Sequence, residues 1–151
     1  MRSIGFIFLL LWYFDNSSSE VLDFLDCASD GHMPIASVIF GDCHITPCKI
    51  DHNDKEDLQL ILNVTNSIPQ FSSISATAEM IQLGGTWAVN ISPNNPCISW
   101  KCPVHKTMQY VFNASIDFSN IRVKFPGTLR VSGILDDKDH PIFCVEMKVR
   151  F

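Results

Sequence analysis

The segment 142–151 reads IFCVEMKVRF, and its pattern decides the fold class. From Val145 to Arg150, apolar and charged side chains alternate one by one. Successive side chains of a β-strand point to opposite faces, so this alternation predicts a strand with one buried face and one face in water. Such a strand needs neighbouring strands beside it and an apolar layer against its buried face.

Further segments cluster or alternate β-branched and aromatic residues in the same way. They are residues 57–65 (DLQLILNVT), 73–83 (SISATAEMIQL), 109–116 (QYVFNASI) and 129–135 (LRVSGIL). Turn formers such as Gly84-Gly85 and Pro126-Gly127 separate them, and helix signals are scarce. Many short strands with regular turns predict an all-β fold, a β-sandwich, without an internal repeat or a domain boundary.

Composition limits the class of protein. The chain has 151 residues, of which 46% are hydrophobic and 18% charged, which suits a single globular domain with a substantial core. The formal net charge is −5. A chain with this charge has no basic field to attract phosphate groups, so we expect no nucleic acid partner.

The start of the chain predicts a targeting segment. Arg2 precedes the uncharged run 4–14 (IGFIFLLLWYF), which is shorter than the roughly 20 residues that a membrane-spanning helix needs. The run has no polar face, so it fits the apolar region of a secretory signal better than an amphipathic helix. Ser17 and Ser19 are small residues before a cut at Glu20. We therefore expect a signal peptide over residues 1–19 and a mature domain over residues 20–151.

Six cysteines follow, which in an oxidising compartment predict a disulfide framework. They are Cys27, Cys43, Cys48, Cys97, Cys102 and Cys144. Spacing alone leaves fifteen pairings open, of which the simplest joins each close pair locally and leaves the first and last cysteine to each other. The alternative is a zinc site built from the two close pairs with His44, His52 and His105. The signal peptide favours disulfides over this alternative.

Three sequons for N-glycosylation lie in the predicted mature chain, at Asn63, Asn90 and Asn113. Asn63 lies in an alternating segment whose polar face should be exposed, which suits a glycan. Asn90 is followed by Ser92-Pro93, a context that weakens use of a sequon.

No catalytic motif is present in the sequence. The five histidines are scattered among turn-like segments, without the spacing of a nucleophile or of a zinc hydrolase. Cysteines in disulfides supply no thiol nucleophile. We expect no enzyme activity, no metal and no cofactor.

The cysteines and their flanks resemble the ML lipid-recognition family, which includes the small soluble Niemann-Pick type C sterol-transfer protein and the group 2 mite allergens. The motifs are 24–27 (FLDC), 43–48 (CHITPC), 63–65 (NVT), 110–112 (YVF) and 143–146 (FCVE). A proline, Pro103, follows the fifth cysteine as in the family, and the resemblance covers residues 20–151.

The resemblance implies an immunoglobulin-like sandwich of two antiparallel sheets with a lipid between them. It implies disulfides Cys27–Cys144, Cys43–Cys48 and Cys97–Cys102. It places the ligand entrance between a loop over residues 85–93 and a second loop that reaches Phe125-Pro126. Ser132 stands where the family leads us to expect a tryptophan.

Carried over residue by residue, the resemblance implies a set of ligand-binding residues. Val89 matches an entrance residue, Ile121 a pocket residue, and Tyr110 with Phe112 an aromatic pair that lines the cavity. Trp87 is expected at the rim for a different reason, because it follows Gly84-Gly85 in a turn-rich segment. The full set of predicted ligand-binding residues is Trp87, Val89, Ile91, Tyr110, Phe112, Ile121, Val123 and Phe125. Taken singly, Tyr110, Phe112, Ile121 and Phe125 would also be ordinary core residues in any sandwich.

The function that follows is a non-enzymatic lipid-binding or lipid-transfer protein, which holds a sterol or a fatty-acid-like lipid. We expect a monomer in the extracellular space or the lysosomal lumen, with transient contact to a membrane or a membrane transporter. The alternative is an extracellular recognition module that presents a lipid or a microbial component to a receptor.

Overall fold

The computed structural model describes residues 22–28, 32–51, 54–65, 68–136 and 140–151. The predicted signal peptide over residues 1–19 and the predicted cut before Glu20 lie outside the described residues, as does His52. In the described part of the chain, no helix is long and apolar enough to cross a membrane.

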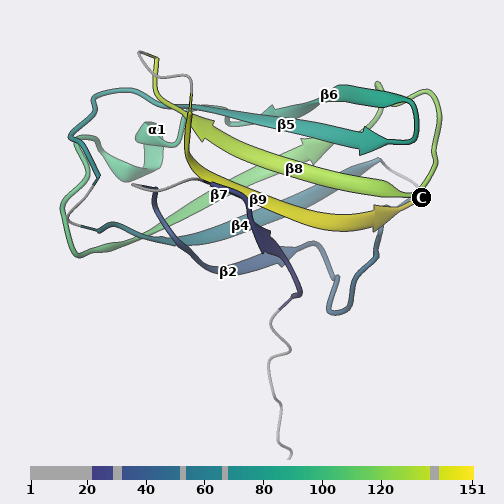
Figure 1. Cartoon of the computed structure of the whole chain (residues 1–151), viewed down its shortest axis with the longest axis horizontal. Helices are drawn as coiled ribbons and strands as arrows, with labels where there is room; N and C mark the ends of the chain where they lie inside the picture. Colours follow the sequence, from purple (N-terminus) through teal and green to yellow (C-terminus); the bar gives the residue numbers. More distant parts are fainter. Residues whose placement is uncertain (1–21, 29–31, 52–53, 66–67, 137–139) are drawn as a thin grey trace, which may run out of the picture.

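The described chain forms nine strands and one short helix (Figure 1). The strands are β1 (Leu25–Asp26), β2 (Ile35–Phe40), β3 (Cys48–Lys49), β4 (Lys55–Asn63), β5 (Ser75–Gln82), β6 (Gly85–Ser92), β7 (Gln109–Asp117), β8 (Gly127–Ile134) and β9 (Pro141–Arg150). The helix α1 (Cys97–Trp100) has a single turn. The predicted all-β fold is therefore confirmed.

The strands form two layers that share β6. Sheet A contains β1, β9, β8, β5 and the first part of β6, with β3 beside β9. Sheet B contains β2, β4, β7 and the last residues of β6, which pair with Ser115–Asp117 of β7. The pairs are antiparallel except for the two-residue pairing of β3 with β9. Because β6 passes from one sheet to the other, the two layers are joined along that edge.

The predicted strand segments are confirmed to within two residues at each end, as β4, β5, β7, β8 and β9. The expectation of an entrance loop over residues 85–93 is wrong, because residues 85–92 form strand β6. Trp87 and Val89 of this strand lie opposite Met80 and Ala78 of β5, so the Gly84-Gly85 turn makes a hairpin. β2 (IASVIF) was not anticipated either, although its run of apolar and β-branched residues is a strand signal.

The three disulfides join Cys27 to Cys144, Cys43 to Cys48 and Cys97 to Cys102, as the resemblance implies. Every cysteine is therefore used, and the zinc alternative is wrong. The first disulfide attaches the segment after β1 to β9 across a sequence separation of 117 residues.

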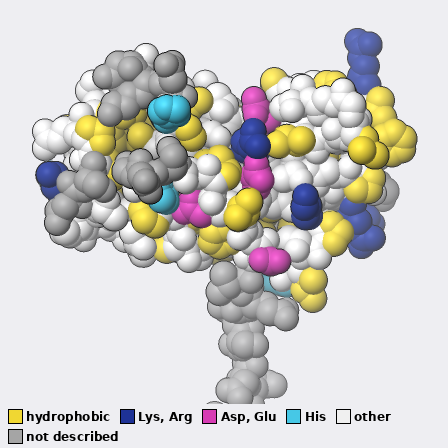
Figure 2. All heavy atoms as spheres, viewed as in Figure 1, with side chains coloured by type: hydrophobic (Ala, Val, Ile, Leu, Met, Phe, Trp, Pro, Cys, Tyr) yellow, Lys and Arg dark blue, Asp and Glu magenta, His cyan; other side chains and the backbone are white. Residues whose placement is uncertain are grey.

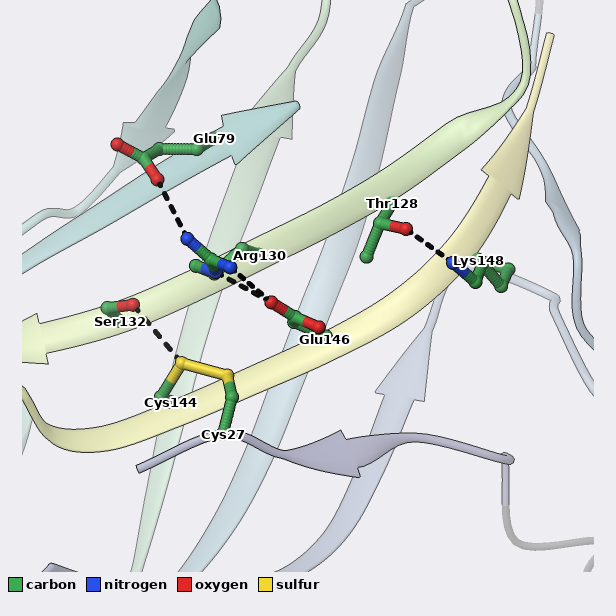
Figure 3. Close-up of polar contacts among 8 residues, drawn as sticks. All are labelled: Cys27, Glu79, Thr128, Arg130, Ser132, Cys144, Glu146 and Lys148. Atoms are coloured by element: carbon green, nitrogen blue, oxygen red, sulfur yellow. Dashed lines mark hydrogen bonds and ion pairs between the residues drawn. A yellow bond between two sulfur atoms is a disulfide. The ribbon is translucent and has the colours of Figure 1, made fainter. Parts of the chain in front are cut away.

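The outer face of sheet A is polar (Figure 3). Arg130 in β8 donates to Glu146 in β9, with 2.6 Å between Nη2 and Oε1, and its Nη1 lies 3.8 Å from Glu79 Oε2 in β5. Ser132 also lies on this face, and its Oγ donates to Cys144 Sγ at 3.5 Å. The Cys27–Cys144 disulfide thereby helps to bury this small residue, which stands at the expected tryptophan position.

The inner faces of the two sheets pack against each other as one apolar core. Its largest fully buried side chains are Phe40, Phe112, Phe118, Phe143, Met33, Leu58, Leu60, Leu62, Ile74, Met80, Ile116 and Leu129. Every second residue of β4 and β7 contributes to this core, which explains the alternating burial of both strands.

Candidate functional site

One end of the sandwich carries a pocket between the β5–β6 hairpin and the 119–126 segment, which connects β7 to β8. The pocket has a volume of about 370 Å³. Its lining residues are Gln82, Trp87, Asn120, Ile121, Arg122 and Val123. This volume lies within the range of small-molecule sites, roughly 300 to 1,000 Å³. Ile121 of the 119–126 segment lines the pocket and is only 4% exposed as a member of the apolar core, so the pocket borders the interior of the sandwich.

The 119–126 segment is held to the hairpin by two polar side chains. Gln82 Nε2 donates hydrogen bonds to the carbonyl oxygen atoms of Val123 and Phe125. Asn120 Nδ2 donates to the carbonyl oxygen of Ala88 at 2.7 Å. These residues are exposed or half-buried, so water competes with the bonds, which makes the segment easier to open than a packed strand.

A third attachment lies on the other side of the 119–126 segment. Lys124 forms an ion pair with Asp54, and its Nζ lies 5.6 Å from the centroid of the Phe151 ring. Phe151 packs edge-on against Phe118, which in turn packs against Phe40, with ring centroids 5.8 Å and 6.5 Å apart. A row of edge-to-face aromatic rings therefore connects Lys124 of the segment to Phe40 in the core.

The start of the 119–126 segment is fixed by Asp117. Its Oδ1 accepts a hydrogen bond from the backbone N–H of Ser119 at 2.9 Å, and Lys55 lies 3.5 Å from Oδ2. The hydrogen bonds from Ser119 and the charge of Lys55 together lower the pKa of Asp117 below its ordinary value of 3.8. The carboxylate is therefore ionised at neutral and mildly acidic pH.

The rim of the pocket is apolar and basic. Large hydrophobic side chains are exposed here: Leu83 is 97%, Phe125 61%, Val123 51% and Trp87 39% exposed. Arg122 and Lys124 lie among them in the same segment and are also exposed. Figure 2 shows hydrophobic and basic side chains gathered at the right-hand end, where the β5–β6 turn lies in Figure 1.

Three of the eight predicted ligand-binding residues line this pocket: Trp87, Ile121 and Val123. Phe125 follows in the same segment, where its carbonyl accepts the bond from Gln82. Val89 is buried and Ile91 half-buried on β6, and both pack into the core.

Tyr110 and Phe112 lie elsewhere, toward the start of β7, near α1. They pack with Trp100 of α1, at centroid distances of 5.7 Å and 6.3 Å. The Tyr110 hydroxyl accepts a hydrogen bond from the His105 backbone N–H, and Trp100 Nε1 donates to the carbonyl of Val111. Tyr110 and Phe112 therefore belong to an aromatic cluster beside α1, which lies at the opposite end of the sandwich from the β5–β6 turn (Figure 1).

The interior offers no charged group to a ligand. Among the described residues, Ser132 is the one buried polar residue, and it lies on the outer face of sheet A, away from the interior. Among the residues that the structure describes, no group of His, Cys, Asp and Glu side chains could hold a metal ion. The lining of the pocket therefore combines the apolar side chains of Trp87, Ile121 and Val123 with the polar side chains of Gln82, Asn120 and Arg122.

Sequence reasoning did not identify Gln82, Asn120 and Trp100. Gln82 and Asn120 act through bonds to carbonyl groups 32 to 43 residues away, which no periodicity encodes. Trp100 lies in a four-residue helix between two disulfide-bonded cysteines, too short to show a helical pattern. The only available signal was its position as a large aromatic residue inside a disulfide loop.

Comparisons with known proteins show which family and which solved structures this chain is similar to. A family model described as ML domain matches residues 21–151. The comparison with curated protein sequences gave no match. Among solved structures, a Niemann-Pick type C2 protein from Japanese carpenter ant superposes with a TM-score of 0.67 at 15% identity, over 85% of this chain and 98% of that chain. Chicken MD-1 complexed with lipid IVa superposes with a TM-score of 0.53 at 12% identity, over 84% and 86%.

Proposed function

Because the chain belongs to the ML-domain family, we propose that it is a non-enzymatic lipid-binding protein that takes up one sterol or acyl-chain lipid between its two sheets. The observation that carries the proposal is the pocket at the Trp87 end, which is lined by Ile121, a member of the apolar core between the sheets. A lipid is the class of ligand that needs no charged or catalytic group in its site.

The 119–126 segment acts as the lid of the site. When it moves away from the hairpin, the apolar side chains behind Ile121 become accessible to a ligand, and Gln82 and Asn120 lose their backbone partners. A ligand that hides roughly 300 Å² of apolar surface there gains about 7 kcal/mol, enough to offset much of the entropy lost on binding. The freed amide groups are then available to the polar end of the lipid.

The rim docks transiently on a membrane during exchange. Leu83, Phe125 and Val123 can enter the headgroup region, while Arg122 and Lys124 are attracted to anionic lipids. Such contact would bring the mouth of the site to the lipid surface. The predicted signal peptide and the three disulfides support a secretory route, with the protein acting outside the cell or in the lysosomal lumen.

The test is lipid extraction followed by mass spectrometry on the protein purified from its native source, combined with uptake of a fluorescent sterol and a fluorescent fatty acid. We expect one co-purifying lipid class per protein and saturable uptake of the matching probe. Protein that holds no extractable lipid and takes up neither probe contradicts the proposal. A stable receptor complex that persists after delipidation would instead favour the recognition module.

The variant that best probes the site is Phe125→Asp. Phe125 is 61% exposed, so a charge is tolerated by the fold and should block docking and uptake. Ile121→Asp would instead bury a charge and unfold the chain, since this residue is 4% exposed. Ile98→Asp is the matched control, because Ile98 is 71% exposed in α1, outside the residues that line the pocket or its rim.

A further inference from the structure

The three sequons lie on one face, the outer face of sheet B. Asn63 of β4 lies opposite Gln109 of β7, Asn113 belongs to β7 itself, and Asn90 of β6 lies opposite Asp117 of β7. The corresponding positions in β7 are residues 109, 113 and 117, which are four residues apart. Because this spacing is even, the three asparagine side chains point to the same side of the sheet. All three asparagines are exposed, at steps of about 13 Å along β7.

Two of these asparagines accept the same kind of hydrogen bond from a glutamine side chain. Gln109 Nε2 donates to Asn63 Oδ1 at 3.1 Å, and Gln59 Nε2 donates to Asn113 Oδ1 at 2.9 Å. In each case a glutamine lies directly across the β4–β7 pair. The bonds use the oxygen of the asparagine amide and not Nδ2, the atom to which a glycan is attached. The folded sheet therefore accommodates a sugar on either residue without losing a hydrogen bond.

An apolar pair lies between the two sites. Ile61 of β4 faces Val111 of β7, in the register between Asn63–Gln109 and Gln59–Asn113. Val111 is 38% exposed and Ile61 is half-buried, and Ile39 of β2, opposite Gln59, is 51% exposed. Exposed apolar side chains grouped on one sheet face favour association with another molecule. Glycans on Asn63 and Asn113 would flank this pair on both sides.

Asn90 differs from the other two. Its sequon ends at Ser92-Pro93, and its cross-strand neighbour is the ionised Asp117 in place of a glutamine amide. It also lies on β6, three residues after Trp87, a strand that the other two asparagines do not share.

We propose that N-glycans on Asn63 and Asn113 shield the Ile61–Val111 pair and keep the outer face of sheet B from self-association, while Asn90 stays unmodified. The inference rests on the secretory route of the proposed function. Transfer forms a bond between Nδ2 and C1 of the first sugar, and the bond between that C1 and the diphosphate of a lipid-linked oligosaccharide breaks. The diphosphate leaves with the lipid, and Nδ2 gives up one proton.

The first test maps the glycans on the full chain secreted from cultured eukaryotic cells. We expect glycopeptide mass spectrometry to find Asn63 and Asn113 occupied and Asn90 free. Asn63→Gln and Asn113→Gln should each remove one glycan from the intact mass, and Asn90→Gln should remove none. Secreted protein with neither Asn63 nor Asn113 modified, or a chain that never enters the secretory pathway, overturns the proposal. Neither measurement depends on lipid binding.

The second test measures shielding on the folded protein. Endoglycosidase trimming to the first sugar leaves both asparagine side chains in place, and we expect the self-association constant measured by analytical ultracentrifugation to rise about tenfold. Ile61→Thr with Val111→Thr should abolish this rise. Ile98→Thr is the control, because Ile98 is 71% exposed in α1 and should leave the rise unchanged. Trimmed protein that associates no more than the glycosylated form overturns the shielding role.

Discussion

Gly133 and Phe143 lie opposite each other in the β8–β9 pair, and the ring of Phe143 lies directly against the glycine. A Cβ atom at position 133 would be 2.1 Å from Cε1 of this ring. The ring also packs against Phe112 and Trp100, with centroids 6.1 Å and 6.2 Å away. The missing side chain of Gly133 therefore gives the aromatic cluster at the α1 end its space.

Gly133→Ala should destabilise the fold by about 2 kcal/mol, because the added methyl group overpacks a fully buried ring that cannot move aside. Urea unfolding with the disulfides intact measures the change. Gly85→Ala is the matched control: its Cβ would be 3.5 Å from the Trp87 ring, an ordinary contact, so stability should hardly change. Equal effects of the two substitutions would show that the packing at Phe143 is not the cause.

Gln82→Ala should accelerate exchange of a bound fluorescent lipid about fivefold, because it removes two hydrogen bonds that hold the 119–126 segment closed. Stopped-flow displacement measures the rate. Gln59→Ala removes one hydrogen bond on the outer face of sheet B and should leave the rate unchanged. Exchange that is equally fast in wild type and Gln82→Ala would exclude the segment as the lid.

Replacing Cys27 and Cys144 by serine should cost more stability than removal of either local disulfide. On the chain-entropy model, a loop of 117 residues contributes about 5 kcal/mol and each loop of five residues about 2 kcal/mol. Chemical unfolding of the three double-serine variants gives the ranking. The same loss from Cys43→Ser/Cys48→Ser would contradict the entropic ranking and indicate a local packing role.

Glu56 should make the fold more stable as the pH falls toward 4.5. Burial raises the pKa of Glu56 above its ordinary value of 4.5, and the nearby Asp51, Asp42 and Asp57 carboxylates raise it further, against the hydrogen bond from the Asp51 N–H. For a carboxyl whose pKa is raised by folding, the stabilising contribution is complete below 4.5 and is lost as the pH rises through the raised value.

Glu56→Gln keeps the acceptor for the Asp51 N–H and removes the charge, so it should be more stable than wild type at neutral pH and lose this advantage on acidification. Urea unfolding from pH 4.5 to neutral measures both curves. Asp117→Asn is the contrasting variant: the lowered pKa of Asp117 stabilises the fold above pH 3.8, and that stability is lost as the pH falls through the lowered value. A pH-independent difference between Glu56→Gln and wild type would contradict the prediction.

The β-rich segments were predictable because a half-buried strand records its two faces in alternate residues, as β9 does from Val145 to Arg150. β6 was harder to predict, since six of its eight residues are exposed, and it pairs with one sheet and then with the other. A strand that changes sheets does not keep one buried face, so the period of two is lost.

The candidate site was predictable in part. The predicted set included Trp87, Ile121 and Val123, which the fold brings into one pocket. It also gave Tyr110 and Phe112, which the fold places with Trp100 at the other end. A matched position in the chain identifies a residue's place on its strand, but the neighbours of its side chain depend on what the other layer packs against it.

The sequence by itself determined the all-β class, the six-cysteine framework and the family, because strand periodicity and cysteine order are properties of the chain alone. Only strand pairing and packing hold the 119–126 segment to the hairpin through Gln82 and Asn120, make room for Phe143 at Gly133, and bring the three sequons onto one face. Each of these relationships joins residues that only strand pairing and sheet packing bring together, and packing energies depend on distance in space and not on position along the chain.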